Sequence, residues 1–240
     1  MASESPSPPP LLAVRDLRAF YGDFQALFGV FLRVERGQVV AIIGANGAGK
    51  TTLLKSVAGL IAAPAGAIMF DGQSIGGLPA NLVVAKGVAL VPEGRRLFPS
   101  LTVEENLRIG GQLNRSGHWT LERVYDLFPD LRARRRLPAT ALSGGQQQMA
   151  AIGRALMSNP SLLLLDEVSL GLSPAVIQDV YAGIAAVIAD GLSVIIVEQD
   201  IGHALKSADY VYCLQEGRIA LEGTPARLTR QDISAAYFGV

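Results

Sequence analysis

Nearly uninterrupted apolar runs of four or five residues recur along the chain and predict buried β-strands. Such runs occupy Val39–Ile43, Val88–Val91, 162–165 and Ser193–Val197. Strands without polar alternation are typical of parallel sheets that helices cover on both faces. Helical patterns separate the runs, so the sequence predicts an α/β fold with a parallel sheet. Polar residues that follow these runs should gather at the carboxyl edge of that sheet, where ligands bind.

Weaker patterns predict the remaining parts. Segments 11–17, 26–34 and 67–70 are predicted as strands, and 211–214 with 218–221 as a final hairpin. From about 93 to 160 the apolar positions take helical spacing, and Thr102 with Glu105 forms a capping-box pattern that opens a helix. This part is interpreted as a helical lobe inserted into the sheet domain. Residues 1–10 are rich in Ser and Pro and are predicted to form a disordered tail.

A glycine-rich segment follows Val39–Ile43 and leads into a predicted helix. Glycines allow main-chain N–H groups to close on phosphate oxygens, and a helix N-terminus adds partial positive charge. Lys50 can reach the β- and γ-phosphates, and the Thr51 hydroxyl can bind Mg²⁺. An ordinary strand-to-helix turn is the alternative, but the spacing, the lysine and the threonine together favour a nucleoside triphosphate site. The predicted binding residues are Gly44, Ala45, Asn46, Gly47, Ala48, Gly49, Lys50, Thr51 and Thr52.

Two carboxylates, Asp166 and Glu167, follow the apolar run 162–165, where an unpaired charge is costly. Helix capping or exposure to solvent would explain an isolated pair. A phosphate loop on the same chain favours a role in hydrolysis. We expect Asp166 to hold Mg²⁺, directly or through water, and Glu167 to polarise the water that attacks the γ-phosphate.

Composition argues against several other classes of protein. The 240 residues include 21 basic and 21 acidic side chains, and a formal net charge of zero argues against a nucleic-acid surface. No apolar run reaches the roughly 18 residues of a membrane-spanning helix, and the N-terminus lacks the features of a secretion signal, so we expect a cytoplasmic protein. Cys213 lies in an apolar run and is expected in the core. The arginines within 132–136 are interpreted as a solvated helix face, with a contact to an acidic partner as the alternative.

Three segments taken together resemble the nucleotide-binding subunit of ABC transporters: the loop 44–52, the sequence Leu-Ser-Gly-Gly-Gln at 142–146, and the segment 162–167. The resemblance extends from about 12 to 239. It implies a P-loop NTPase (RecA-like) core with a parallel sheet, an N-terminal antiparallel β subdomain, and an α-helical subdomain inserted at about 93–160. The ABC ATPase domain would then span 11–240.

The same resemblance implies a head-to-tail dimer that binds ATP between its subunits. In it, the signature residues of one subunit bind the γ-phosphate that the other subunit's phosphate loop holds; here these residues are Ser143, Gly144, Gly145 and Gln146. Tyr21 matches the family's aromatic residue that stacks on adenine, and packing in the core is the alternative for this side chain.

Two positions depart from the common family pattern. Glu93 stands where most members have a Gln that senses Mg²⁺ and contacts the membrane subunit, and Gln199 stands where most have a His that contacts the γ-phosphate. A Gln side chain donates a hydrogen bond but cannot shuttle a proton. Glu167 is therefore the better candidate for positioning water, with Gln199 as a second catalytic candidate.

The segments 92–99, 142–148 and 197–199 resemble one subfamily, the ATP-binding subunits of importers for branched-chain amino acids, amides and urea. The resemblance implies ATP and Mg²⁺ as cofactors. It also implies a second ATP-binding subunit, a heterodimer being favoured over a homodimer, and separate permease subunits on the inner face of the cell membrane. No nucleic acid is expected as a partner.

Two other functions fit the sequence less well than transport. A soluble ABC ATPase acting on nucleic acid or ribosomes is disfavoured, because the chain has no long coiled-coil insertion, no second ATPase unit and no net positive charge. A module that binds ATP without turnover is disfavoured by the presence of Glu167.

Overall fold

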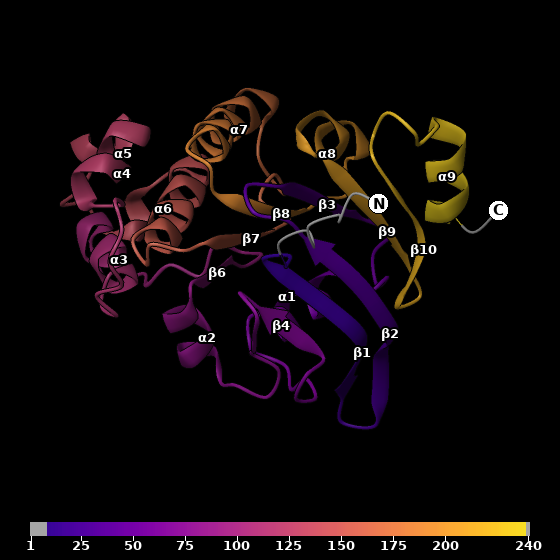
Figure 1. Cartoon of the computed structure of the whole chain (residues 1–240). Helices are drawn as coiled ribbons and strands as arrows, with labels where there is room; N and C mark the ends of the chain where they lie inside the picture. The colour runs from indigo at the N-terminus through magenta and orange to yellow at the C-terminus, as the bar shows by residue number, and fades with distance from the viewer. Residues whose placement is uncertain (1–8, 239–240) are drawn as a thin grey trace, which may run out of the picture.

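Two β-sheets and a set of flanking helices make up the computed structural model, which describes residues 9–238 (Figure 1). The predicted disordered tail falls, apart from residues 9 and 10, outside the described residues. In the described part, no helix combines the length and the apolar character that crossing a membrane requires.

The larger sheet has six strands in the order β10-β9-β3-β8-β7-β6. β3 (Val39–Ile43), β6 (Val88–Val91), β7 (Leu162–Asp166) and β8 (Ser193–Val197) are the predicted buried strands, and all run parallel. β9 (Tyr210–Gln215) pairs in parallel with β3 and forms the predicted hairpin with β10 (Arg218–Gly223). Because Val197 pairs with both Ile42 and Asp166, the loops after β3, β7 and β8 leave the sheet side by side.

The smaller sheet is antiparallel, in the order β2-β1-β4-β5. It contains β1 (Leu12–Tyr21), β2 (Phe24–Val34), β4 (Ile68–Phe70) and β5 (Gln73–Ser74). β1 and β2 extend beyond the predicted segments to a two-residue turn, with Tyr21 paired to Phe24. Main-chain pairing continues there although both side chains are exposed, so the apolar pattern indicated only the buried part of each strand.

Nine α-helices surround the sheets in the described residues, and η1 (Ala139–Ala141) adds a short 3₁₀ turn. They are α1 (Lys50–Val57), α2 (Ala80–Lys86), α3 (Val103–Gly110), α4 (Leu121–Leu127), α5 (Pro129–Ala133), α6 (Gly144–Leu156), α7 (Pro174–Ala189), α8 (Ile201–Ser207) and α9 (Arg230–Phe238). α3 to α6 occupy the predicted helical stretch and lie together on the β6 side of the molecule (Figure 1). The predicted capping box is present, since Thr102 Oγ1 accepts from the Glu105 N–H at 3.2 Å and Glu105 Oε2 accepts from the Thr102 N–H at 2.8 Å.

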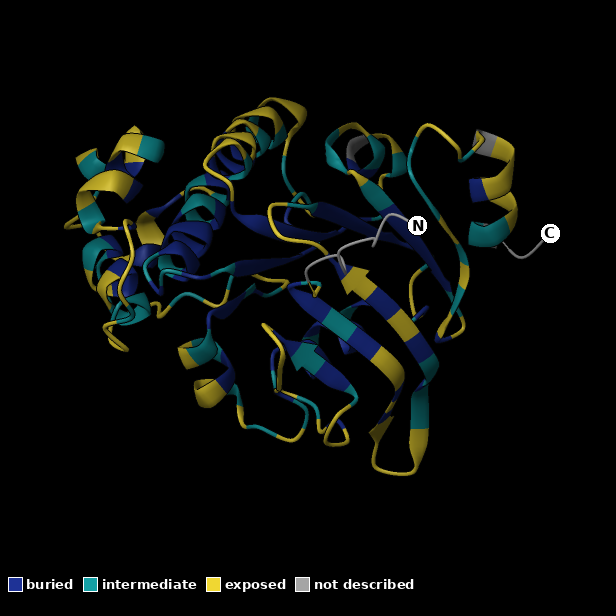
Figure 2. Cartoon of the chain, viewed as in Figure 1, coloured by how far each residue is buried: buried dark blue, intermediate teal, exposed yellow. Residues whose placement is uncertain are grey.

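The central strands of the larger sheet are buried (Figure 2), and the contacts of β3 illustrate what buries them. Val40 and Ile42 pack in a cluster with the smaller sheet and α1, whereas Val39 packs with residues of α3, α4, α6 and α7. Ala41 and Ile43 belong to a third cluster, with residues of α8, α9 and β9. Successive side chains of a strand point to opposite faces, so a strand buried on both faces requires the continuous apolar run that predicted it.

Two surface and core predictions can also be compared with the structure. Cys213 is buried in β9, and burial raises the pKa of its thiol to about 11. Arg132, in α5, forms ion pairs within the chain and lies 2.8 Å from carboxylate oxygens of both Glu122 and Asp126. Its side chain is 44% exposed, which agrees with a solvated face.

Candidate active site

The phosphate loop leaves β3 at the carboxyl edge of the larger sheet and ends where α1 begins. Gly44 has a φ of 153°, and a Cβ there would lie 2.3 Å from the Leu214 carbonyl oxygen. Gly49 has a φ of 106°, and a Cβ there would lie 2.8 Å from Leu27 Cδ2. Both positions therefore require glycine. Gly49 also has no side chain with which to cap α1, which leaves first-turn N–H groups available to an anion.

Lys50 is the first residue of α1 and is 4% exposed. Its ammonium group donates hydrogen bonds to the carbonyl oxygens of Gly44 at 2.7 Å and Ala45 at 3.1 Å, and lies 3.6 Å from Glu167 Oε1. The loop thus bends over its own lysine and holds the positive charge where phosphates would enter. The predicted helix after the loop begins at Lys50, so Lys50, Thr51 and Thr52 all lie in its first turn.

Asp166 ends β7 beside this first turn. Thr51 Oγ1 donates a hydrogen bond to Asp166 Oδ1 at 3.1 Å, which brings the two predicted metal ligands together. Burial raises the pKa of Asp166 to about 6; the Thr51 hydrogen bond opposes this shift, and the charges of Glu167 and Glu93 add to it. A cation in contact with Asp166 would reverse the cost of burying its charge.

Glu167 follows directly and has a left-handed backbone with a φ of 49°, which is uncommon for a residue with a side chain. Its N–H donates to the Val197 carbonyl oxygen at 3.0 Å, which ties the end of β7 to the end of β8. Its carboxylate accepts a hydrogen bond from Gln199 Nε2 at 2.6 Å. The two predicted catalytic residues are therefore in direct contact, with the ammonium group of Lys50 beside them.

A cavity of about 740 Å³ joins these groups to the smaller sheet, and its size fits a nucleotide. Lys50, Thr51, Glu93, Glu167 and Gln199 line one part, and aromatic residues of β1 and β2 line the other. Glu93 thus shares the cavity with Thr51, whereas the third predicted metal ligand, Asp166, is buried behind Thr51 and is not among the described residues that line the cavity.

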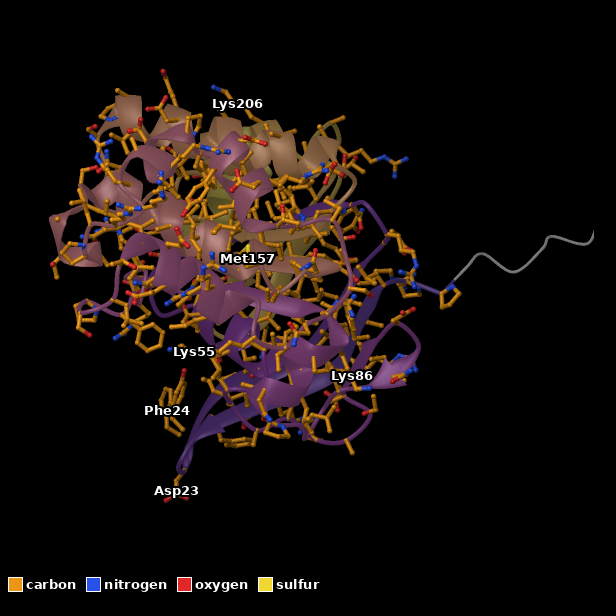
Figure 3. All side chains as sticks on the ribbon, turned by 90° about the vertical axis from the view of Figure 1, so that its left-hand side faces the viewer. Asp23, Phe24, Lys55, Lys86, Met157 and Lys206 are labelled. Carbon is orange, nitrogen blue, oxygen red and sulfur yellow. The ribbon has the colours of Figure 1, made fainter. Side chains whose placement is uncertain are left out.

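Tyr21 lies in the aromatic part of the cavity wall, and its ring is about half exposed. This exposure contradicts the alternative that Tyr21 packs in the core. Its hydroxyl is 3.3 Å from Thr52 Oγ1, so the ring stands directly beside the phosphate loop. Phe24 lines the same wall, is 72% exposed, and projects with Asp23 from the β1–β2 turn (Figure 3).

The signature segment begins α6 and is not among the described residues that line the cavity. Ser143 Oγ accepts from the Gln146 N–H at 3.3 Å, and Gln146 Oε1 accepts from the Ser143 N–H at 3.1 Å, which completes a second capping box. A Cβ on Gly145 would lie 2.2 Å from Val176 Cγ1, so this glycine allows α6 to approach α7 closely. Within one chain, Ser143, Gly144, Gly145 and Gln146 do not meet the phosphate loop.

Sequence reasoning missed several residues at this site. Phe28, Leu170 and Glu216 also line the cavity. Glu198, which follows β8, is a fully buried carboxylate that pairs with Ser169 and Tyr181. The available signal was its place directly after a buried strand, the same signal that singled out Asp166.

A loop that binds phosphate, and carboxylates at the neighbouring strand ends, define a P-loop nucleoside triphosphatase. Comparisons with known proteins narrow this class. The ABC transporter family matches residues 27–169. A branched-chain amino acid transport ATP-binding protein of Pseudomonas aeruginosa, BraG, is 45% identical over 232 residues, 95% of this chain and all of that protein. A probable LivF protein of Archaeoglobus fulgidus is 34% identical over 92% of this chain and 95% of its own.

Solved structures agree with the sequence comparisons. A nucleotide-free ATP-binding cassette from an ABC transporter has a TM-score of 0.79 and 26% identity, with 95% of each chain covered. A cassette in its ADP conformation has a TM-score of 0.77 and 27% identity, with 95% of this chain and 94% of that chain covered. The chain belongs to the ABC transporter family and is an ATP-binding cassette with ATPase activity coupled to transport.

Proposed function

We propose that this chain is the ATP-hydrolysing subunit of an importer that takes up branched-chain amino acids, or related amides or urea, through a separate permease. The transport role is supported by BraG, which this chain matches over its whole length. Hydrolysis is supported above all by one observation: the Glu167 carboxylate contacts Gln199 and lies 3.6 Å from the lysine of the phosphate loop.

The residues present fit a Mg²⁺ ion. Mg²⁺ prefers oxygen ligands and is commonly bound by one or two protein groups together with substrate phosphates and water. In the described part of the chain, no group of three or more His, Cys, Asp or Glu side chains forms a complete metal site. Thr51 and Asp166 instead offer two neighbouring oxygens, and we assign the ion to them, with Glu93 holding it through water. Once bound, Mg²⁺ would neutralise charge on the β- and γ-phosphates.

The chain's own groups then have separate tasks. Lys50 and the N–H groups that begin α1 bind the phosphates, and the ring of Tyr21 stacks on adenine. Glu167 accepts a hydrogen bond from the attacking water and aligns it with the γ-phosphate, because hydrolysis requires the attacking and leaving oxygens to be in line. Gln199 donates to Glu167 and so fixes the direction of its carboxylate.

A second ATP-binding subunit would complete the site. The signature residues are not among the described residues that line the cavity of their own chain. A glycine-rich helix N-terminus such as theirs is suited to bind a phosphate of a nucleotide held by the other subunit. Pseudomonas aeruginosa has two high-affinity branched-chain amino acid transport ATP-binding proteins, BraG and BraF, which are 45% and 31% identical to this chain. This favours a heterodimer. The assembly would lie in the cytoplasm, on the inner face of the membrane, where it would contact the permease. A nucleic-acid partner is not proposed, because the formal net charge of the chain is zero.

The test is to purify the full chain with the membrane proteins that it captures and to measure ATP hydrolysis and oligomeric state. The wild type should hydrolyse Mg·ATP. Glu167→Gln should abolish turnover and accumulate a dimer with bound ATP, because the amide cannot align the water but leaves the phosphate loop intact. Glu122→Gln, on the exposed surface of α4, is the matched control and should behave as the wild type. A wild type that hydrolyses ATP but never associates with a permease would refute the transport role.

A further inference from the structure

Glu198 is a buried carboxylate that has no assigned task. It follows β8, is 1% exposed, and is not among the described residues that line the nucleotide cavity. Its Oε2 accepts a hydrogen bond from Ser169 Oγ at 2.7 Å, and its Oε1 accepts one from the Tyr181 hydroxyl at 2.8 Å. A buried charge is stable only when its oxygens are satisfied, so this geometry is strongly preferred over any in which one donor is absent. We call Glu198, Ser169 and Tyr181 the Glu198 clamp.

The clamp joins three segments that are far apart in sequence. Ser169 lies in the loop 167–172 after β7, Glu198 in the loop after β8, and Tyr181 in α7. The same two loops are joined once more, by Gln199 and Glu167 at 2.6 Å. One contact therefore carries the proposed chemistry, and the adjacent one holds the loops that present it.

Glu167 needs such support because of its backbone. Its left-handed φ of 49° is a conformation that persists only where the surroundings impose it. The Glu167 N–H is held by Val197 on one side, and Ser169, two residues later, is held by Glu198 on the other. Leu170, in the same loop, lines the cavity together with Gln199, so this loop reaches the part of the cavity in which hydrolysis would take place.

We propose that Glu198 is a positioning residue for ATP hydrolysis, acting by fixing loop 167–172 to the end of β8 so that Glu167 and Gln199 keep their contact. This inference rests on the proposed hydrolytic function of the site. The negative charge suits the role, because both hydroxyls donate to it; a neutral glutamine would present an N–H₂ group to one of them. Ser169, Tyr181 and Glu198 are not among the described residues that line the nucleotide cavity, so the clamp should affect turnover and leave ATP binding unchanged.

The test compares kcat and KM for Mg·ATP in variants of the full chain, purified with any subunits it captures. Ser169→Ala and Tyr181→Phe should each lower kcat by about fivefold to tenfold with KM nearly unchanged, since a misplaced catalytic group slows the chemical step. Ser169→Thr, which keeps a hydroxyl, should restore kcat. Ser158→Ala and Tyr212→Phe remove hydroxyls that hydrogen-bond to main-chain groups elsewhere, and should leave kcat unchanged.

A further variant separates positioning from general stability. In a Gln199→Ala background the effect of Ser169→Ala on kcat should be much smaller, because coupled residues do not act additively. Full additivity would overturn the proposal, and so would a raised KM with unchanged kcat, or equal losses in the two control variants.

A wild-type chain that does not hydrolyse ATP would contradict the proposed function. The role of the clamp in holding the loop would then be tested by a second measurement. Main-chain hydrogen exchange in 167–172 should then be at least about tenfold faster in Ser169→Ala, with exchange in α6 unchanged, because the contact opposes local opening. Unchanged exchange in 167–172 would overturn the proposal.

Discussion

The carboxylate of Asp166 should make the nucleotide-free protein less stable at neutral pH than at acid pH. The side chain is 2% exposed and accepts one hydrogen bond, from Thr51, which satisfies only part of a carboxylate. Burial and the charges of Glu167 and Glu93 raise its pKa from 3.8 to about 6. Asp166→Asn replaces the carboxylate with a neutral group of the same shape that can still accept from Thr51.

The sign of the effect follows from proton binding. Between pH 3.8 and about 6 the folded protein holds a proton on Asp166 that the unfolded chain has released, so folding stability decreases as pH rises through this window. A shift of roughly two pKa units corresponds to about 3 kcal/mol. Proteins respond to a buried charge with an effective dielectric constant well above that of a dry interior, so we expect about 1–2 kcal/mol. For a chain of this size, that is roughly 3–6 °C in the midpoint of thermal unfolding.

Thermal unfolding without nucleotide or divalent cation measures this directly. Asp166→Asn should match the wild type at pH 4 and be more stable at pH 7.5, with the difference developing between those values. Asp126→Asn, on the exposed surface of α4, is the control and should show a small difference across the same range. A variant that is equally stable or less stable than the wild type at pH 7.5 would refute the reasoning.

Two further predictions concern the loop before α3 and the nucleotide cavity. Asn106→Ala should lower the free energy of unfolding by about 2–3 kcal/mol, measured by urea denaturation, because the fully buried amide bonds the Phe98 N–H and three carbonyl oxygens; a loss below about 0.5 kcal/mol would contradict this. Tyr21→Ala should weaken ATP binding by about tenfold in calorimetric titration, whereas Tyr21→Phe, which keeps the ring, should bind nearly as well as the wild type. Equal weakening in the two Tyr21 variants would show that the hydroxyl, not the ring, is what matters.

The sequence predicted best those features whose physical cause is local or periodic. β3, β6, β7 and β8 were predicted because burial on both faces demands continuous apolar runs. The helix start at Thr102 follows from a capping box within four residues of sequence. The contact between Thr51 and Asp166 was predictable from topology, since parallel strands bring their carboxyl ends to the same edge of the sheet, and only β8 separates β3 from β7.

Features that depend on contacts across the fold were missed. The apolar pattern did not reveal α2, α8 or α9, which are short or peripheral helices. The Glu198 clamp depends on side chains 17 and 29 residues apart meeting in space, which no local pattern encodes. Nor did the signature motif indicate that Gly145 serves packing as well as binding, because Val176 approaches it only in the folded chain.

The two halves of the proposed ATP site are connected within one chain by α7. At its first turns, Val176 packs against Gly145 closely enough to exclude any side chain there, so the signature end of α6 moves only with α7. Five residues further along the same helix, Tyr181 donates to Glu198 and so reaches the loops that carry Glu167 and Gln199. A helix transmits displacement along its length because its main-chain hydrogen bonds resist bending. In the proposed dimer, contact between the signature residues and a nucleotide on the other subunit would thereby be linked mechanically to the placement of Glu167 and Gln199, the proposed water-positioning residues.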